Sequence, residues 1–222
     1  MNKGSNLKNG LVTFLTITGD LMALNILWFV CSLPIITIGP STVSLFTVTL
    51  KLAEGESVSV LKTFFKAFKD NLKQSLIVGA FSIFTIFTLY ADVNYILAID
   101  GTLQKVYIVV ACIVLALLLT TITYLNALIA KYNNTLKGHI INTFKLAFVN
   151  PIQTILMWLI LLVPVFCVLF IQPIVLLYMG WFFILFLVSL PIYICSIIMT
   201  GIFKKFNKSE GENLWKEKKQ EN

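Results

Sequence analysis

The fold is decided by residues 21–53, which read LMALNILWFVCSLPIITIGPSTVSLFTVTLKLA. A helix needs about 20 mainly apolar residues to cross a bilayer, and residues 21–38 nearly meet this length. Pro34 and the pair Gly39-Pro40 are expected to break the helix, because proline lacks a backbone donor and clashes with the preceding turn. Residues 41–53 then form an apolar segment equivalent to about 20 Å of helix. The stretch predicts a broken helical hairpin in a membrane.

The composition points to lipid as the solvent of the whole chain. Of 222 residues, 58% are hydrophobic and only 12% are charged, whereas soluble domains carry about 25% charged residues. We therefore predict an all-α fold, a polytopic transmembrane helical bundle. Residues 1–203 form one transmembrane domain, and residues 204–222 form a charged tail that is frayed or disordered. Beyond the hairpin, spans are expected at residues 74–98, 106–130, 151–170 and 175–203.

The lysines predict the topology. All 17 basic residues are lysines, and with six spans every one except Lys105 falls on a single side of the membrane. If residues 41–53 did not cross, the lysine clusters would fall on opposite sides, against the lysine bias of cytoplasmic loops. We expect about six spans in the cell membrane, with both termini in the cytoplasm. The absence of arginine, whose planar fork reads phosphates and bases, argues against a nucleic-acid partner.

Two segments between spans share the pattern T-F-x-x-A-F followed by N-x-x-Q-[ST], at an offset of about 80 residues. They predict a weak internal repeat with units of about residues 45–98 and 125–172, related by an axis along the membrane normal. Chance similarity between two aromatic-rich loops is the alternative. Each asparagine is expected to accept a hydrogen bond as a helix N-cap, with the glutamine reaching back to it. The predicted capping residues are Asn71, Gln74, Asn150 and Gln153.

The first repeat copy reads as an amphipathic helix on the cytoplasmic surface. Its predicted apolar stripe comprises Leu61, Phe65, Phe68 and Leu72. A second stripe at the same spacing comprises Lys62, Lys66, Lys69 and Lys73. Such a helix lies in the interface, either as a simple anchor against the lipid bilayer or as a docking surface for a soluble partner. The second copy has Ile141, Phe144 and Phe148 but only Lys145, so its polar face is less basic.

The sequence contains no recognisable catalytic set, so we expect neither an enzyme nor a cofactor or metal site. His139 is the single histidine and has no cysteine or carboxylate at ligand spacing, which favours a solvated interfacial residue. Asp20 and Asp92 are carboxylates near hydrocarbon, where ionisable groups are functional candidates. Both are expected at interfaces, because the first span begins near Asp20 and Asp92 lies about 27 Å of helix beyond Gln74.

The broken hairpin is the candidate site. Backbone that leaves helical geometry at membrane depth must be buried in protein or line a wet cavity. One interpretation is a structural hairpin whose hydroxyls satisfy freed backbone groups, and the other is a binding site for a solute or a lipid headgroup. The candidate residues are Asn25, Ser32, Pro34, Thr37, Gly39, Pro40 and Ser41.

These residues resemble the YesL-like family of bacterial membrane proteins. The likeness lies in G-D-L at 19–21, N-I-L-W at 25–28, S-L-P at 32–34, T-I-G-P at 37–40, L-F at 45–46 and F-K-A-F-K-D-N-L-K-Q at 65–74. The resemblance implies a multi-span plasma-membrane protein of a family that lacks an established activity and is often associated with carbohydrate utilisation and sugar uptake. It carries over no catalytic residue.

Two classes of function follow from these observations. The first is an accessory or regulatory membrane component linked to carbohydrate uptake or utilisation, with a partner such as a sugar ABC transporter or another membrane complex. The second is a small-solute transporter or channel with its site at the broken hairpin.

Overall fold

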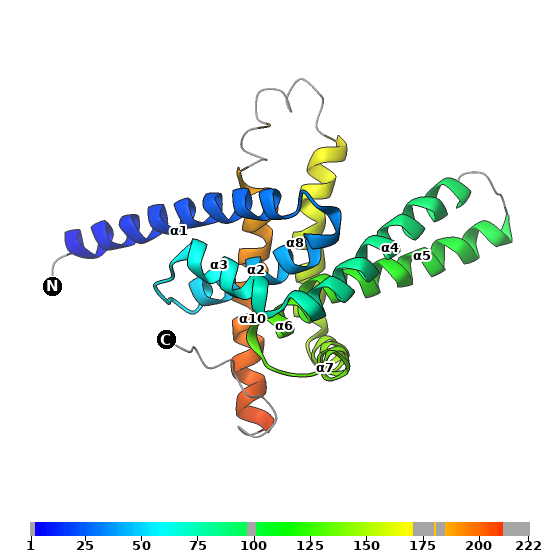
Figure 1. Ribbon diagram of the computed structural model, residues 1–222. Coiled ribbons are helices and arrows are strands. Elements are labelled where there is room, and N and C mark those ends of the chain that lie inside the picture. The colour runs from blue at the N-terminus through cyan, green and yellow to red at the C-terminus, as the bar shows by residue number, and fades with distance from the viewer. Residues whose placement is uncertain (1–2, 97–100, 171–179, 181–184, 211–222) are drawn as a thin grey trace.

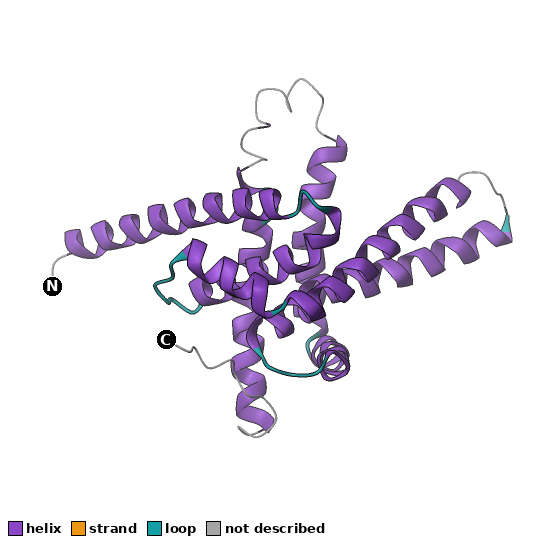
Figure 2. Ribbon diagram, in the orientation of Figure 1, coloured by secondary structure: helices purple, strands orange, loops and turns teal. Residues whose placement is uncertain are grey.

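The computed structural model describes residues 3–96, 101–170, 180 and 185–210, and these residues form helices and connecting turns without a strand (Figures 1 and 2). The predicted all-α fold is therefore confirmed. The elements are α1 (Lys3–Cys31), a 3-10 turn (Ile35–Thr37), α2 (Ile38–Ala53), α3 (Val60–Asp70), α4 (Leu72–Ile96), α5 (Thr102–Thr120), a π-helix (Thr121–Leu125), α6 (Asn126–Lys131), α7 (Leu136–Val149), α8 (Pro151–Phe170) and α10 (Ser189–Glu210).

Helix α2 lies at the centre of the molecule. It packs against α10, α3, α6, α4 and α1, and 11 of its 16 residues are buried. Thr49 and Ser196 join α2 to α10 through hydroxyl groups 2.8 Å apart. The surrounding helices explain why this segment is short and rich in Ser and Thr, because a helix enclosed by protein need not match lipid along its whole surface.

The number of spans agrees with the sequence-based expectation of about six. Five stretches of described residues are long and apolar enough to cross a membrane: Gly10–Cys31, Ile35–Ala53, Leu72–Val93, Thr102–Lys131 and Ser189–Asn207. Helices α7 and α8 count as a sixth if the pair, bent by 105°, is taken together. Residues 41–53, which are too short to cross the membrane alone, thus belong to the stretch Ile35–Ala53, which is long enough to cross it.

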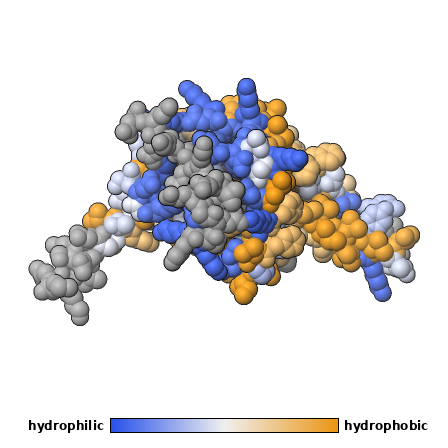
Figure 3. Space-filling model, turned by 90° about the horizontal axis from the view of Figure 1, so that it is seen from below, coloured by the Kyte–Doolittle hydropathy of each residue, from blue (hydrophilic) through white to orange (hydrophobic). Residues whose placement is uncertain are grey.

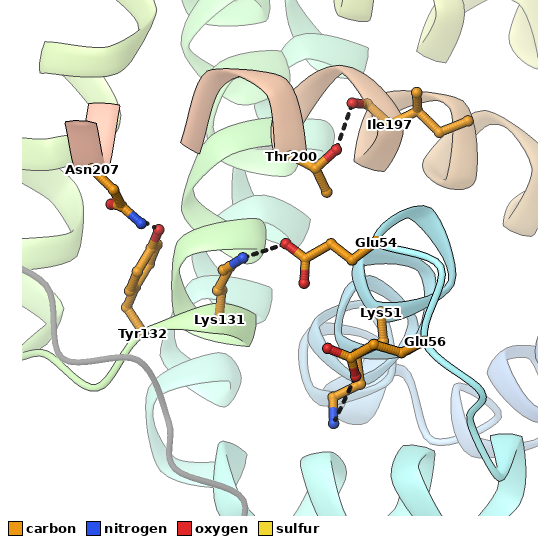
Figure 4. Close-up of polar contacts among 8 residues, drawn as sticks. All are labelled: Lys51, Glu54, Glu56, Lys131, Tyr132, Ile197, Thr200 and Asn207. Atoms are coloured by element: carbon orange, nitrogen blue, oxygen red, sulfur yellow. Dashed lines mark hydrogen bonds and ion pairs between the residues drawn. The ribbon is translucent and has the colours of Figure 1, made fainter. Parts of the chain in front are cut away.

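The ends of α2, α6 and α10 lie together at one end of the bundle. The Lys131 ammonium pairs with Glu54 in the α2–α3 turn, and the Tyr132 hydroxyl donates to Asn207 Oδ1 across 3.3 Å (Figure 4). Hydrophilic residues gather over the middle of this face, with hydrophobic helices at its flanks (Figure 3). The six-span prediction requires this arrangement, because it places the ends of the second, fourth and last spans on the same side.

Two parts of the molecule extend away from this centre. The N-terminal half of α1 projects on one side and the α4–α5 hairpin projects on the other (Figure 1). Large apolar side chains on both are exposed, among them Leu11, Phe14, Phe84 and Phe87. These surfaces suit lipid and not water, since soluble monomers rarely expose contiguous apolar patches of this extent.

Two helix boundaries differ from the expected ones. Helix α1 is continuous from Lys3 to Cys31, and its apolar stretch Gly10–Cys31 extends ten residues before Asp20, near which the first span was expected to begin. At the other end, α10 continues through residue 204 to Glu210, where a frayed tail was expected. Residues 175–179 and 181–184 of the expected last span, and residues 211–222 of the expected tail, lie outside the described part of the chain.

Candidate functional site

The break in the first hairpin lies at Ser32–Pro34 and not at Gly39-Pro40. Helix α1 ends at Cys31, and the Thr37 hydroxyl lies 2.6 Å from the carbonyl oxygens of both Cys31 and Pro34. Gly39 and Pro40 are the second and third residues of α2. The missing donor of Pro40 costs nothing there, because the first four N–H groups of a helix have no partner within the helix. The expectation that this pair breaks the helix is therefore wrong.

Asn25 connects α1 to α10. Its side chain is fully buried, and its Oδ1 accepts hydrogen bonds from the backbone N–H groups of Val188 and Ser189, 3.1 and 2.9 Å away. These donors belong to the start of α10, where the first N–H groups lack helical acceptors. Asn25 thus caps a helix more than 160 residues away in sequence, and this contact gives it a structural role.

Gly39 and Gly79 form the closest helix crossing in the hairpin region. A Cβ on Gly79 would lie 2.8 Å from the Cα of Gly39, and a Cβ on Gly39 would overlap the carbonyl oxygen of Ser75. Only hydrogen at both positions allows α2 and α4 to approach this closely. The sequence pattern singled out Gly39 but missed Gly79, whose role depends on a contact between two helices.

The remaining candidate residues of the hairpin do not share one polar cavity. Pro34 is exposed, whereas Ser41 is fully buried. The hydroxyls of Ser32 and Ser41 are buried without a hydrogen-bond partner among the described residues. The structure therefore brings Ser32, Pro34 and Thr37 together at the turn, and it directs Asn25 and Gly39 to other helices.

A cavity of about 570 Å³ lies beside the hairpin, between α2, α4, α8, the π-helix and the residues around the start of α10. Its aliphatic wall includes Val78, Ile83, Ile122, Leu161, Val165 and Ile192. The polar side chains at its wall are Trp28, Thr42, Ser82 and Asn126, and none of the described lining residues is charged. Sequence reasoning missed this cavity, because its described wall combines residues of seven elements, including Trp28 of α1 and Asn126 of α6.

Helix α3 presents a basic surface outside the core. Phe64 and Ala67 are buried on its inner side, where α3 packs against α2. Lys62, Lys66 and Lys69 of α3 are exposed, and so is Lys73 in the first turn of α4. The predicted apolar stripe is packed only in part, since Leu61 and Phe65 are exposed by 59% and 45% whereas Phe68 packs against the core. Helix α3 therefore has an inner face fixed to the protein and an outer face that carries lysines beside apolar side chains.

Helix α7 differs from α3 in its outer face. His139, Thr143 and Leu146 are buried, so the expectation that His139 is solvated is wrong. Phe148 is 82% exposed, and Ile141 and Phe144 are exposed as well. An outer face with this many apolar side chains is typical of a helix lying in the membrane interface.

The repeat stays a prediction, because the two copies do not share the same burial in their first half. The T-F-x-x-A-F pattern pairs Phe64 with Phe144, but Phe64 is buried and Phe144 is 40% exposed. In the second half the agreement is better, since Asn71 and Asn150 are both buried, as are Ser75 and Thr154.

The capping chemistry differs from the prediction. Asn71 Nδ2 donates to the Ala67 carbonyl across 2.9 Å, and Asn150 Nδ2 donates to the Leu146 carbonyl across 3.0 Å. Each amide thus satisfies the end of the preceding helix. Gln74 does not reach back to Asn71 but donates to the Asn134 carbonyl, 2.9 Å away. Gln153, at the corresponding glutamine position, is exposed.

Comparison with known proteins places these features in a family context. Residues 21–93 match the profile of a family described as "Protein of unknown function, DUF624". The chain is also 28% identical over 153 residues to "Uncharacterized protein YesL" of Bacillus subtilis (strain 168), an alignment that covers 67% of this chain and 72% of that protein. The resemblance to the YesL-like family is confirmed. The part of the chain that the family profile matches contains the broken hairpin, the basic helix α3 and the crossing of Gly39 with Gly79. No solved structure matches the chain.

Proposed function

We propose that this YesL-like membrane protein is a non-enzymatic accessory or regulatory component of a carbohydrate uptake or utilisation system, and that it presents α3 to a partner protein. Helical spans of the YesL-like type support the membrane part of this proposal. The carbohydrate link rests on the family resemblance. That resemblance also suggests the class of partner, such as a sugar ABC transporter in the cell membrane. The lysine-bearing end of the bundle is the expected cytoplasmic side.

The observation that carries the proposal is the fixed orientation of α3. Phe64 and Ala67 anchor its inner face in the core, so the exposed lysines are held on a rigid helix. Its exposed Leu61 and Phe65 also suit contact with lipid, but a membrane anchor alone does not need the packing of Phe64 and Ala67 against the core. A rigid row of charges is suited to recognition of an acidic partner surface, because little side-chain and backbone order is lost on binding.

A transporter with its site at the broken hairpin has less support. Asn25 holds the start of α10, Thr37 closes the turn and Gly39 allows the crossing with α4. These polar or small groups are thus occupied by contacts within the protein. The hairpin therefore favours the structural interpretation over a solute site.

The proposal predicts that removal of the α3 lysines separates partner binding from membrane insertion. Lys62, Lys66, Lys69 and Lys73 are all replaced by glutamine in the full-length chain, which is cross-linked and purified from membranes. Exposed ion pairs contribute roughly 0.2–1 kcal/mol each, so we expect partner binding to weaken by about tenfold or more. Insertion should be unchanged, because the spans and not the lysines hold the chain in the membrane.

The matched controls keep the charge at these four positions or remove charge elsewhere. Replacing the same four lysines by arginine should retain binding. The double variant Lys62→Gln/Lys69→Gln should bind more weakly than Lys204→Gln/Lys205→Gln, which removes the same charge from exposed positions at the same end of the molecule. Full partner binding by the quadruple glutamine variant, or solute flux by the purified protein alone in liposomes, would contradict the accessory role.

A further inference from the structure

The cavity beside the hairpin has a size typical of a small-molecule site. Its volume of about 570 Å³ lies within the range of about 300–1,000 Å³ that ligand pockets occupy. Among the described residues of its walls, four have polar side chains, the others are apolar, and none carries a charge. An occupant must therefore be largely apolar and uncharged, because an unpaired ion in such surroundings is strongly disfavoured.

The hydrogen-bond donors at the wall are engaged within the protein. Trp28 Nε1 donates to Thr42 Oγ1 across 3.1 Å, and the Thr42 hydroxyl donates to the Ile38 carbonyl across 2.8 Å. The Ser82 hydroxyl donates to the Val78 carbonyl across 2.8 Å. The cavity therefore offers little to a ligand that only accepts hydrogen bonds.

One hydrogen-bond acceptor at the wall is not engaged. Asn126 is 4% exposed and its Nδ2 donates to the Ile122 carbonyl, but its Oδ1 has no hydrogen-bond partner among the described residues. The cavity thus joins an apolar wall to one buried acceptor without a partner among the described residues, Asn126 Oδ1.

The local backbone also marks this region. The π-helix Thr121–Leu125 immediately precedes Asn126, and such short π segments inside α-helices are frequent at functional sites. The extra residue in the turn rotates the positions that follow it relative to a continuous α-helix. The distortion thus helps to set the position of Asn126 at the cavity.

We propose that this cavity binds a neutral, single-chain lipid that bears a hydroxyl group. The chain would occupy the aliphatic space, and the hydroxyl would donate to Asn126 Oδ1. A buried acceptor without a partner is unfavourable in hydrocarbon, so a donating hydroxyl gains more there than at a hydrated surface. This site is separate from the lysines of α3, and it does not depend on the proposed accessory role.

The test uses Trp28 as a reporter at the cavity wall. In full-length protein held in lipid nanodiscs, Trp158, Trp181 and Trp215 are replaced by phenylalanine, and Trp28 fluorescence is titrated with bromoundecanol or bromoundecane, whose bromine atoms quench nearby indoles. We expect saturable quenching by both, with the alcohol binding about two- to tenfold more tightly, the value of one net hydrogen bond. A neutral monoacylglycerol should displace the alcohol.

Variants then separate the hydroxyl contact from the cavity itself. Asn126→Leu should reduce the preference for the alcohol, because it removes the only unpaired acceptor among the described residues of the wall. Ser82→Phe should abolish quenching by filling the space, whereas Ser82→Ala should bind as the parent does. Each variant is compared only if it elutes as the parent protein does, and the comparison of alcohol with alkane on the parent needs no variant. Equal binding of alcohol and alkane by the parent, or failure of the monoacylglycerol to compete, would overturn the proposal.

Discussion

At the scale of single residues, a buried amide in α1 organises the last helix of the chain. Asn25 is fully buried and accepts from two backbone N–H groups at the start of α10. Within a membrane, no water is available to bind these N–H groups. If Asn25 were removed, the start of α10 would have to rearrange to satisfy them. Asn25 therefore links the first and last described helices through one oxygen atom.

We predict that Asn25→Leu destabilises the protein by about 1–3 kcal/mol, the usual cost of leaving a buried hydrogen-bonding group unpaired. The measurement is the unfolding midpoint in detergent with increasing SDS. Asn133→Leu is the control, because Asn133 is an exposed asparagine in the loop before α7. Equal midpoints for the two leucine variants would contradict the capping role of Asn25.

At the scale of the helix, the crossing of α2 and α4 depends on two glycines. Gly79→Ala should destabilise the fold by about 1–3 kcal/mol, as overpacking does, because the new methyl group would meet the backbone of Gly39. Gly201→Ala in α10 has nothing within 4 Å of the added Cβ. That control should be neutral or stabilising by up to about 1 kcal/mol through helix propensity. Thermal unfolding of both variants measures the difference, and a harmless Gly79→Ala would show that α2 and α4 do not meet here.

The sequence predicted those features of the elements that arise from local pattern. Apolar runs located the spans, and the lysine spacing identified the exposed side of α3. Local pattern could not reveal which apolar side of α3 is buried, since Leu61 and Phe64 are equally apolar and only contact with α2 distinguishes them. It also missed Gly79, and it assigned Asn25 to a site, because the partners of both residues lie on other helices.

At the scale of the whole molecule, the lysine distribution predicts an alternating path through the membrane. One contact agrees with it, because the pairing of Lys131 with Glu54 holds the ends of α2 and α6 beside each other. The α1–α2 turn and Gly101 at the start of α5 are then expected on the opposite side.

We predict that single cysteines at Ser57 and Asn133 are labelled from the same side of the membrane, and that cysteines at Leu33 and Gly101 are labelled from the other. All four positions are exposed, so access depends on the side of the membrane. The experiment uses a background without Cys31, Cys112, Cys167 and Cys195, intact cells and an impermeant maleimide, with labelling expected only at positions 33 and 101. Labelling of residue 133 from outside would rule out this topology.

The central position of α2 has a consequence for biosynthesis. The ribosome produces α2 early, but α10, which it packs against most, is made last. Between them lie the 135 residues from 54 to 188, which take roughly 7–27 s to translate at about 5–20 residues per second. During this interval Thr49 and its neighbours have no Ser196 to meet, and α2 must remain in the translocon or with an insertase until the final span arrives. Completion of the core is thus a late event in synthesis, and a chain that terminates before residue 189 leaves its most buried helix open to quality-control proteases.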